Sequence, residues 1–595
     1  MAGNQEQEGG VVSYNILTNG KVNTAGYDLM SIQVTKGINK ISTAKLKIVD
    51  GGVSENQPWN QSDSKDFAPG VEIEIQAGYE NNNKTIFKGI IIKHGLKITK
   101  SGDSYLSIEC KDKAVKLTVG RKNKLFVKKK DSDILTEIIN AYGIEKQIDA
   151  TTFQHKEVIQ HYCTDWDFVM MRAEINGLVA ITDDGKLLVK KPDLSSEPVV
   201  SITYGVNMYD FQADMDARTQ LTKVVAHAWD SDKQALVESS SKTPDELSQG
   251  STPSSKLAQT IGLDEYLLQT TAGIKDVSVL EAWANAKHTR SYLSKIKGTV
   301  TCIGTAAIKP GTLIELSGLS SQFNGKAFVS GVTHIVEEGN WTTTAEMGLS
   351  FDWFSEETPL IDAPPASGMV APMKGLFIAK VVKIDEDEAG EYRIQIKIPI
   401  LGDNQGWWAR LSTMYATNES GTFFYPEVGD EVIVGFLNED PQYPIIMGSV
   451  HSKSSKPPFI PENTNKTKGF VTRSKLKITF DDEKKITKIE TPGGNSITLN
   501  DDERNIIIED QNKNKIEMNK EGIAITSQKD IIMKAQGKIV MEAQGNIEAK
   551  ATGDAKVEGM NVAMKGSMKF AAEGAMTEVK GSGQTTIKGG IVMIN

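Results

Sequence analysis

Cysteine is scarce in this chain of 595 residues, and the few that occur lie far apart. The three cysteines are Cys110, Cys163 and Cys302. A disulfide framework needs a dense, even set of cysteines, and a structural zinc site needs ligands in close sequence pairs. We therefore expect buried, reduced thiols, and neither a disulfide-stabilised fold nor a metal centre built on cysteine.

Positive charge and long apolar runs are also in short supply. The chain has 67 basic and 77 acidic residues, a net charge of −10. Nucleic-acid binding needs a basic surface to neutralise phosphates, so a general nucleic-acid binder is disfavoured. No stretch approaches the roughly 18 apolar residues of a membrane span, and MAGNQEQEGG lacks the parts of a signal peptide. We expect a protein made in the cytoplasm that does not use the general secretory route.

Motifs of common enzymes are absent from the sequence. It contains no Gly-x-Ser-x-Gly, no Walker loop, no Gly-x-Gly-x-x-Gly and no His-Glu-x-x-His. Ser-x-x-Lys occurs several times, for example at 42–45 and 294–297, but a pattern with two fixed positions arises by chance, and the motifs that accompany it in serine enzymes are missing. We therefore predict no catalytic residue and no enzyme.

No group of ligand-type side chains has the spacing of a metal site. The densest group is His155, His161 and Cys163, which matches no zinc pattern and is better explained by packing or surface positions. The acidic run 385–388 lies between two predicted strands, so we interpret it as a solvated turn. The sequence predicts neither a bound metal nor a cofactor.

What the chain does contain is a pattern of strands and turns. Glycine is abundant, with 52 residues. Alternation in VEIEIQA places Val71, Ile73 and Ile75 on one face, and the polar run GYENNNK that follows predicts a hairpin turn. Repeated strand and turn signals from residue 28 to 118 predict a small barrel. The fold class we predict is mainly β with minor α.

Three helices are predicted by their capping residues. The first follows Asp131 or Ser132 as N-cap and ends at Gly143. The second has Thr164 as N-cap and ends at Asn176–Gly177. A third begins with a capping box at Ser278.

Two proline-rich polar segments, 355–368 and 452–466, read as linkers around a compact β segment of the size of a small closed barrel. The predicted organisation is a first β-barrel domain at 1–125, a connecting segment of helices and strands at 126–200, a second β-barrel domain at 201–355, a linker at 356–369, the small barrel at 370–452, a linker at 453–474 and a β-helical needle at 475–595.

The C-terminal part repeats with a period of eight residues. Ala-Gln-Gly occurs at 535–537 and 543–545, and Ala-Thr-Gly follows at 551–553. Between the glycines, apolar and small residues alternate with charged ones, and the parity changes near Gly559 and again near Val579. One face of this segment therefore turns toward a core and the other toward water.

A glycine at every eighth residue predicts a corner after each short strand, because glycine tolerates corner torsions and close backbone approach. These corners are Gly537, Gly545 and Gly553. Too many inward residues are alanine or glycine for one chain to fill its core, so we expect three chains around a common axis. A single-chain solenoid and a disordered tail are the alternatives. The predicted shared core consists of Ile539, Met541, Ile547, Val562, Met564 and Phe570.

Three stretches carry a resemblance to a known family. They are HYCTDWDFVMMRAEINGLVAITDDGKL (161–187), WWARLSTMYATNESGTFFYPEVGDEVIVGFLNEDPQYPIIMGSVHS (407–452) and TPGGNSITLNDDE (491–503). With the order of parts, they resemble the VgrG spike family of type VI secretion and the related spikes of extracellular phage-tail-like particles and contractile phage baseplates.

The resemblance implies two tube-like β-barrel hub domains, an OB-fold domain and an intertwined trimeric β-helix or β-prism. It implies a homotrimer that caps the inner tube at the baseplate and crosses a target membrane when the sheath contracts. Implied partners are the chain itself, inner-tube and baseplate proteins, effector cargo and the target membrane, but no nucleic acid. The spike would be part of an injection particle and reach the extracellular space or the target cell.

The resemblance also concerns the end of the needle. The chain ends within the repeats at IKGGIVMIN, so we expect no C-terminal effector domain, and too few residues precede the needle for a lysozyme insertion. A PAAR-type tip protein would dock on Ile591, Met593, Ile594 and Asn595. The rival hypotheses are a secreted glycan-binding or adhesive fibre that uses the OB domain, with the repeat as a stalk, and a cell-wall hydrolase.

Overall fold

The computed structural model describes residues 10–22, 26–52, 58–263, 265–270, 276–359, 361–402 and 406–594. Helix makes up 12% and strand 39%, which confirms the predicted mainly β class. The chain divides into two compact units, Met1–Val450 and His451–Asn595. In the described ranges, no helix combines the length and apolarity that a membrane crossing requires.

The first unit is built on one 13-stranded sheet, here called the hub sheet. Its strand order is β14-β18-β21-β20-β3-β4-β7-β6-β5-β1-β2, and β13 joins through β19, which pairs with β20. The N-terminal strands are β1 (Val12–Thr18), β2 (Lys21–Val22), β3 (Leu29–Gly37), β4 (Thr43–Val49), β5 (Glu72–Tyr79), β6 (Asn82–Ile98) and β7 (Ser104–Lys111). The later strands are β13 (Ser201–Thr203), β14 (Met208–Met215), β18 (Ile296–Ile303), β19 (Leu313–Ser317), β20 (Gly325–Glu337) and β21 (Asn340–Met347).

The two halves of the hub sheet meet where β20 pairs antiparallel with β3, with Gly331 opposite Gly37 and Glu337 opposite Ser31. The core of the N-terminal half also takes in Val336 of β20 and Trp341 of β21, and a second apolar core fills the rest of the later half. The predicted hairpin after VEIEIQA is confirmed: β5 and β6 are joined by Glu80 and Asn81, whose φ values are 48° and 60°. Positive φ at both central residues is what a tight two-residue hairpin requires.

A helical module lies between the two halves in sequence. Its elements are the 3₁₀ helix η2 (Lys113–Thr118), strands β8 (Lys122–Lys130), β9 (Glu145–Ile148), β10 (Gln154–Cys163), β11 (Val179–Asp183) and β12 (Lys186–Lys190), and helices α1 (Asp131–Asn140) and α2 (Asp165–Glu174). The 3₁₀ helix η1 (Lys65–Phe67) lies earlier, between β4 and β5, and its Phe67 packs in the hub core. β8 pairs with β10, and β12 lies between β11 and β9. A core of its own holds α1 and α2 against these strands.

The predicted helix caps are right in one case and wrong in two. The Thr164 side chain accepts a hydrogen bond from Asp167 N at 3.1 Å, which confirms it as the N-cap of α2. α1 begins at Asp131 with Lys130 as N-cap, because the buried Asp131 carboxylate is occupied by other side chains. α4 (Val277–Leu293) is capped by Asp276 and not by Ser278, since the Asp276 carboxylate accepts from Ser278 N.

α4 covers one face of a three-stranded sheet formed by β16 (Ala235–Ser240), β15 (Val224–Asp230) and β17 (Tyr266–Thr270), in that order. The helix and the strands share a small core around Leu280 and Ala284. The short helix α3 (Ser254–Ile261) lies between β16 and β17 in sequence, and the short helix α5 (Phe354–Glu357) follows β21.

The small closed barrel is confirmed. Its order is β22 (Phe377–Lys383), β23 (Ile394–Lys397), β24 (Trp407–Leu411), β28 (Pro444–Ser449) and β27 (Glu431–Phe436). β25 (Ala416–Thr417) and β26 (Ser420–Gly421) form a separate short hairpin. The remaining 3₁₀ helices are η3 (Pro365–Gly368), η4 (Pro399–Leu401) and η5 (Leu437–Glu439). Aliphatic side chains fill the barrel, as small barrels require.

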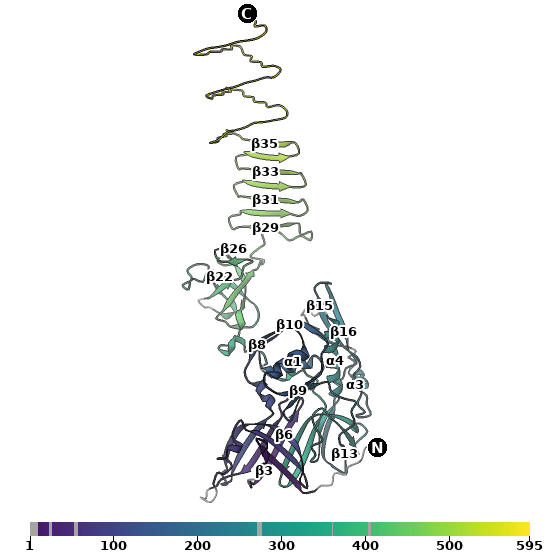
Figure 1. Ribbon diagram of the computed structural model, residues 1–595. Helices are drawn as coiled ribbons and strands as arrows, with labels where there is room; N and C mark the ends of the chain where they lie inside the picture. The colour runs from purple at the N-terminus through teal and green to yellow at the C-terminus, as the bar shows by residue number, and fades with distance from the viewer. Residues whose placement is uncertain are drawn as a thin grey trace. The chain divides into compact units, whose positions relative to one another are not determined.

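The second unit contains one antiparallel sheet of seven strands in sequence order, whose successive rungs are visible in Figure 1. The strands are β29 (Thr467–Val471), β30 (Lys477–Asp481), β31 (Ile486–Glu490), β32 (Ser496–Asn500), β33 (Asn505–Glu509), β34 (Lys515–Asn519) and β35 (Gly522–Thr526). After β35 the chain continues as wide turns without strand assignment as far as residue 594 (Figure 1).

Candidate functional site

One face of the seven-stranded sheet carries a continuous apolar row. Strand register places its members opposite one another from β29 to β35, and we call this row the isoleucine ladder. The ladder consists of Phe470, Ile478, Ile489, Ile497, Ile508, Ile516 and Ile525. Side chains two residues away share the face, and they form a second row of Phe480, Leu499, Ile506, Met518 and Ile523.

The opposite face of the sheet is polar. Lys488 pairs with Glu490 at 2.8 Å, and Lys515 pairs with Glu517 at 2.6 Å. The apolar face is the more exposed: Ile508 is 40% exposed and Ile525 60%. Five members of the ladder line a groove of about 590 Å³. A single chain therefore leaves a contiguous apolar surface in water, which marks an association surface.

The ladder is not among the features predicted from the sequence, because the parity of apolar residues in the C-terminal part was considered only in the glycine repeat beyond residue 529. The signal was present in the strands KITFD, ITKIE, SITLN, NIIIE, KIEMN and GIAIT. Five of these six strands have apolar residues at their second and fourth positions, and turns of similar length separate them. That spacing stacks like residues on like residues in an antiparallel meander.

The chain bends with a period of seven or eight residues beyond β35, and three of these bends include Gly537, Gly545 and Gly553. The φ angles of these glycines lie outside the left-handed region, and an added Cβ would meet no atom within 4 Å. The special torsion expected at the corners is therefore not found. A requirement for small residues there could arise only between chains.

The predicted shared-core residues all lie on the surface of the single chain. Their exposed fractions range from 51% for Val562 to 70% for Met541; the others are Ile539, Ile547, Met564 and Phe570. Of the predicted docking residues for a tip protein, Ile591, Met593 and Ile594 are at least 85% exposed, and Asn595 lies outside the described residues. The roles of these two sets stay predictions.

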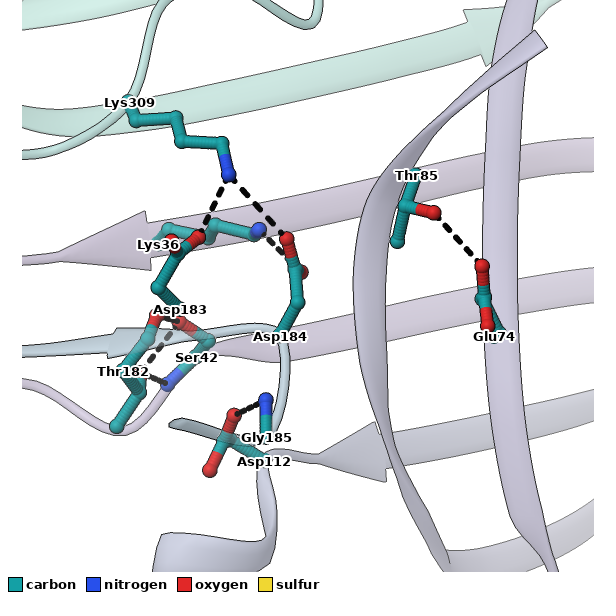
Figure 2. Close-up of polar contacts among 10 residues, drawn as sticks. All are labelled: Lys36, Ser42, Glu74, Thr85, Asp112, Thr182, Asp183, Asp184, Gly185 and Lys309. Carbon is teal, nitrogen blue, oxygen red and sulfur yellow. Dashed lines mark hydrogen bonds and ion pairs between the residues drawn. The ribbon is translucent and has the colours of Figure 1, made fainter. Parts of the chain in front are cut away.

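A partly buried polar joint connects the helical module to both halves of the hub sheet. We define it as Lys36, Asp112, Asp183, Asp184 and Lys309. Lys36 Nζ on β3 donates to Asp184 Oδ1 at 2.6 Å, and Lys309 Nζ contacts Asp183 Oδ1 at 2.8 Å. Figure 2 shows both ammonium groups pointing at the turn between β11 and β12. The joint thus brings together residues from three parts of the chain.

Hydrogen bonds also hold the backbone of this turn and the strand that leads into it. Gly185 N donates to Asp112 Oδ2 at 3.0 Å, and the Ser42 and Thr182 hydroxyls lie 2.6 Å apart (Figure 2). Asp184 and Gly185 have φ values of 53° and 94°, as a tight hairpin turn requires. Ser42, the first residue of one Ser-x-x-Lys pattern, therefore has a structural role.

Charge and burial shift the pKa values of the carboxyl groups in the joint and of His334, which lies on β20 near Lys36. Burial raises the pKa of the Asp112 carboxyl, although the amides of Ala114 and Gly185 oppose this. Burial acts in the same direction on Asp183, but the Lys309 ammonium outweighs it and lowers the pKa of that carboxyl. Burial, with the nearby charge of Lys36, lowers the pKa of His334 to about 3, so its imidazole is neutral at pH 7. The arrangement can hold three segments together, and every charged group of the joint has a partner.

The side chains of the densest group of ligand-type residues, His155, His161 and Cys163, do not share one environment. His155 Nε2 lies 3.0 Å from Asp131 Oδ2, and Arg172 Nε donates to Asp131 Oδ1 at 2.6 Å. Cys163 is buried in the module core, and burial raises the pKa of its thiol. In the described ranges, no three His, Cys, Asp or Glu side chains are arranged to hold a metal ion.

The acidic run 385–388 forms a turn, as predicted. Asp387 accepts hydrogen bonds from the amides of Glu391 and Arg393 at 3.0 and 3.2 Å. Hydrogen bonds from the Arg393 guanidinium and these amides hold the pKa of the Asp387 carboxyl well below its usual range. The carboxylate therefore closes the turn between β22 and β23.

Three family models match this chain one after another. The Alg8 N-terminal domain matches residues 8–338, which is more than half of the chain and includes every strand of the hub sheet except β21. The type VI secretion system/phage-baseplate injector OB domain matches residues 377–451, and the phage baseplate V C-terminal trimerisation domain matches residues 485–567. An injector OB domain followed by a baseplate trimerisation domain defines a spike protein of a contractile injection system.

The chain belongs to the family of the Alg8 N-terminal domain, and its order of domains makes it a VgrG-type spike. Curated relatives agree. Over 202 residues it is 26% identical to the type VI secretion system spike protein VgrG1a of Pseudomonas aeruginosa, covering 32% of this chain and 30% of the relative. Over 115 residues it is 35% identical to the actin cross-linking toxin VgrG1 of Vibrio cholerae, covering 18% of this chain and 10% of the relative. The chain thus spans less than a third of either relative.

Solved structures with similar regions come from phage tails and type VI secretion. A prophage tail protein from Shewanella oneidensis has a TM-score of 0.44 at 11% identity, covering 57% of this chain and 98% of that one. An Escherichia coli component of the type VI secretion system has a TM-score of 0.38 at 12% identity, covering 73% and 99%.

Proposed function

We propose that this protein is a homotrimeric spike that caps the inner tube of a contractile injection machine and punctures the target membrane without catalysing a reaction. The uncovered isoleucine ladder carries the proposal, since five of its seven members, from Ile489 to Ile525, lie in the segment that matches a baseplate trimerisation domain. Self-association follows from that match, and three is the number of chains we propose.

The backbone after β35 supports the same conclusion. Between residues 527 and 594, no strand is assigned within the chain. Extended backbone has one donor and one acceptor at each residue, and these groups need partners in a rigid structure. Neighbouring copies wound around a common axis supply those partners and cover the apolar row at the same time. The result is a needle without open sheet edges.

The remaining assignments complete the proposed machine. The hub would contact inner-tube and baseplate proteins, and effector cargo would travel with the spike. The particle would be assembled in the cytoplasm and delivered to the extracellular space or into the target cell. Mechanical work of this kind needs a stiff needle with a charged outer face, which the lysine and glutamate pairs on the polar face of the sheet provide.

A complementation experiment tests the function in the producing cell. Cells that lack the gene receive the full chain or a chain that ends at Pro458, both at equal abundance. We expect contraction-dependent release of tube protein only with the full chain, because the truncated chain has no needle. Equal release with both chains would contradict the proposal.

Docking of a tip protein is tested separately. Deletion of residues 587–595 removes the exposed apolar end formed by Ile591, Met593 and Ile594. We expect this deletion to abolish co-purification of a PAAR-type protein, whereas Lys580→Ala, in an exposed ion pair with Glu578, leaves it unchanged. Retained co-purification after the deletion would remove the docking proposal.

The glycan-binding fibre has one observation in its favour. Phe423 is 82% exposed and lies against Tyr425 with ring centroids 4.7 Å apart, and Tyr392 is 83% exposed. Exposed rings can stack on sugars, as OB folds that bind oligosaccharides do. This alternative predicts that the full-length protein binds a glycan array and that Phe423→Ala abolishes binding. The spike proposal does not require glycan binding.

A further inference from the structure

The segment that leaves the hub sheet is held by buried charged side chains. We call residues 351–362 the strap; Leu360 lies outside the described residues. The strap follows β21, and its second half lies in the proline-rich polar segment 355–368 that was predicted to be a linker before the barrel. A flexible linker would have solvated backbone, but here side chains from α2 and α4, and that of Arg121 just before β8, approach the backbone of the strap.

Two cations on α4 hold the first part of the strap. Lys287 Nζ donates to Phe351 O at 2.9 Å and lies 3.6 Å from the centroid of the Phe351 ring. Arg290 Nη2 donates to Asp352 O. Lys287 is 1% exposed and Arg290 8%, so neither cation can rely on water. Buried ammonium and guanidinium groups need such partners, because an unpaired buried charge is strongly unfavourable.

A carboxylate on α2 holds the strap from the other side. Phe354 N donates to Glu174 Oε2 at 2.7 Å, and Arg290 Nη1 donates to Glu174 Oε1 at 2.6 Å. Glu174 is 4% exposed. The Glu174 carboxylate therefore binds both the strap backbone at Phe354 and the guanidinium of Arg290, which itself holds the strap at Asp352. The two contacts with the strap are coupled through this ion pair.

The far end of the strap is fixed in a similar way. Arg121 Nη1 donates to Asp362 O at 2.8 Å and to Ile361 O at 3.1 Å. The side chains of Phe354 and Ile361 belong to the apolar core of the helical module. Lifting the strap would open that core and leave Glu174, Lys287 and Arg290 buried without these partners, so the contacts must be lost together.

We propose that the strap is a clamped connection between the hub sheet and the barrel, with Glu174, Lys287 and Arg290 as its clamp. The clamp grips main-chain carbonyls and an amide, and Lys287 also lies against the Phe351 ring, so it holds the path of the strap. A strap held in this way would resist bending when force is transmitted from the hub to the barrel. This role under force rests on the proposed spike function.

Hydrogen exchange of the full-length protein tests the clamp. The variants are Lys287→Met, which keeps the apolar stem beside the rings, and Glu174→Gln, which keeps the shape of the side chain. Lys223→Met is the control, because Lys223 forms an exposed pair with Glu265. We expect amide exchange at 351–358 to accelerate about tenfold or more in both test variants, since each loses a charged hydrogen bond. Exchange of β18 should not change in any variant.

Unchanged exchange of the strap in both test variants would overturn the clamp. Equal acceleration in the strap and in β18 would also overturn it, because the charges would then be part of the hub core and not a local device. If Lys287→Met does not fold, Glu174→Gln decides. The measurement needs no injection machine, so a negative result removes the clamp and leaves the spike proposal to its own tests.

Discussion

Asp131 shows, at the scale of single residues, how a buried charge gains a structural role. Burial alone would raise the pKa of its carboxyl, but hydrogen bonds from His155, Arg172 and Asn176 and the charge of Arg172 hold the pKa at about 2. The ionised carboxylate is therefore favoured in the folded state. It joins the start of α1 to β10 and to the end of α2.

The sign of the resulting pH dependence follows from that lowered pKa. Stability from Asp131 is fully present above the unfolded pKa of about 4 and is lost as the pH falls through about 2, a contribution of roughly 2 kcal/mol. In Asp131→Asn we expect lower stability at pH 7 and a smaller loss of stability between pH 4 and pH 2. Urea unfolding at several pH values measures both. An unchanged pH profile in the variant would contradict the assignment.

A second prediction at this scale concerns the two faces of the needle sheet. Ile508 belongs to the isoleucine ladder, and its neighbour Ile507 lies on the polar face between Thr498 and Glu517. Ile508→Asp would place three carboxylates in the shared core, so we expect loss of the assembled needle and a cost of several kcal/mol, about 3 or more. Ile507→Asp is the matched control and should assemble normally. Light scattering and thermal melting report the outcome, and normal assembly of Ile508→Asp would show that the ladder is not buried between chains.

At the scale of elements, the β11–β12 hairpin shows how ion pairs fix the position of a turn. Its turn is held by Lys36 from one half of the hub sheet and by Lys309, which lies between β18 and β19. Buried ion pairs add little net stability compared with an apolar contact, but removing one partner is costly. The polar joint therefore fixes how the hairpin docks.

Asp184→Asn tests this docking, because asparagine tolerates the positive φ of the turn. The variant leaves Lys36, which is 4% exposed, without its carboxylate, and we expect a loss of about 3 kcal/mol. Asp183→Asn is the neighbouring control; its partner Lys309 is 39% exposed, so the loss should stay below about 1 kcal/mol. Equal losses in chemical denaturation of the two variants would contradict this account.

The sequence predicted those features that depend on nearby residues. The hairpin at Glu80 and Asn81 and the cap at Thr164 were found because their signals lie within a few positions of each other. Asp131 was assigned as a possible cap because its partners are 24 to 45 residues away. The partners of the polar joint are up to 148 residues apart, so periodicity and capping could not reveal it.

At the scale of the whole molecule, the two units differ in how far they bury their own apolar side chains. The unit Met1–Val450 fills its own cores, from the hub sheet to the closed barrel. The unit His451–Asn595 exposes the isoleucine ladder and the predicted core residues beyond it. A chain whose apolar side chains are buried in one unit and exposed in the other is expected to associate through the unit that exposes them.

The absolute mass of the full chain in solution, measured by light scattering beside a truncation that ends at Pro458, tests this account most directly. Three chains of 64.9 kDa in the full-length particle are predicted, with a weakened or monomeric truncation, because the needle supplies the shared core. A full-length protein with the mass of one chain would contradict the account, since the ladder and the segment beyond it would then have no partner.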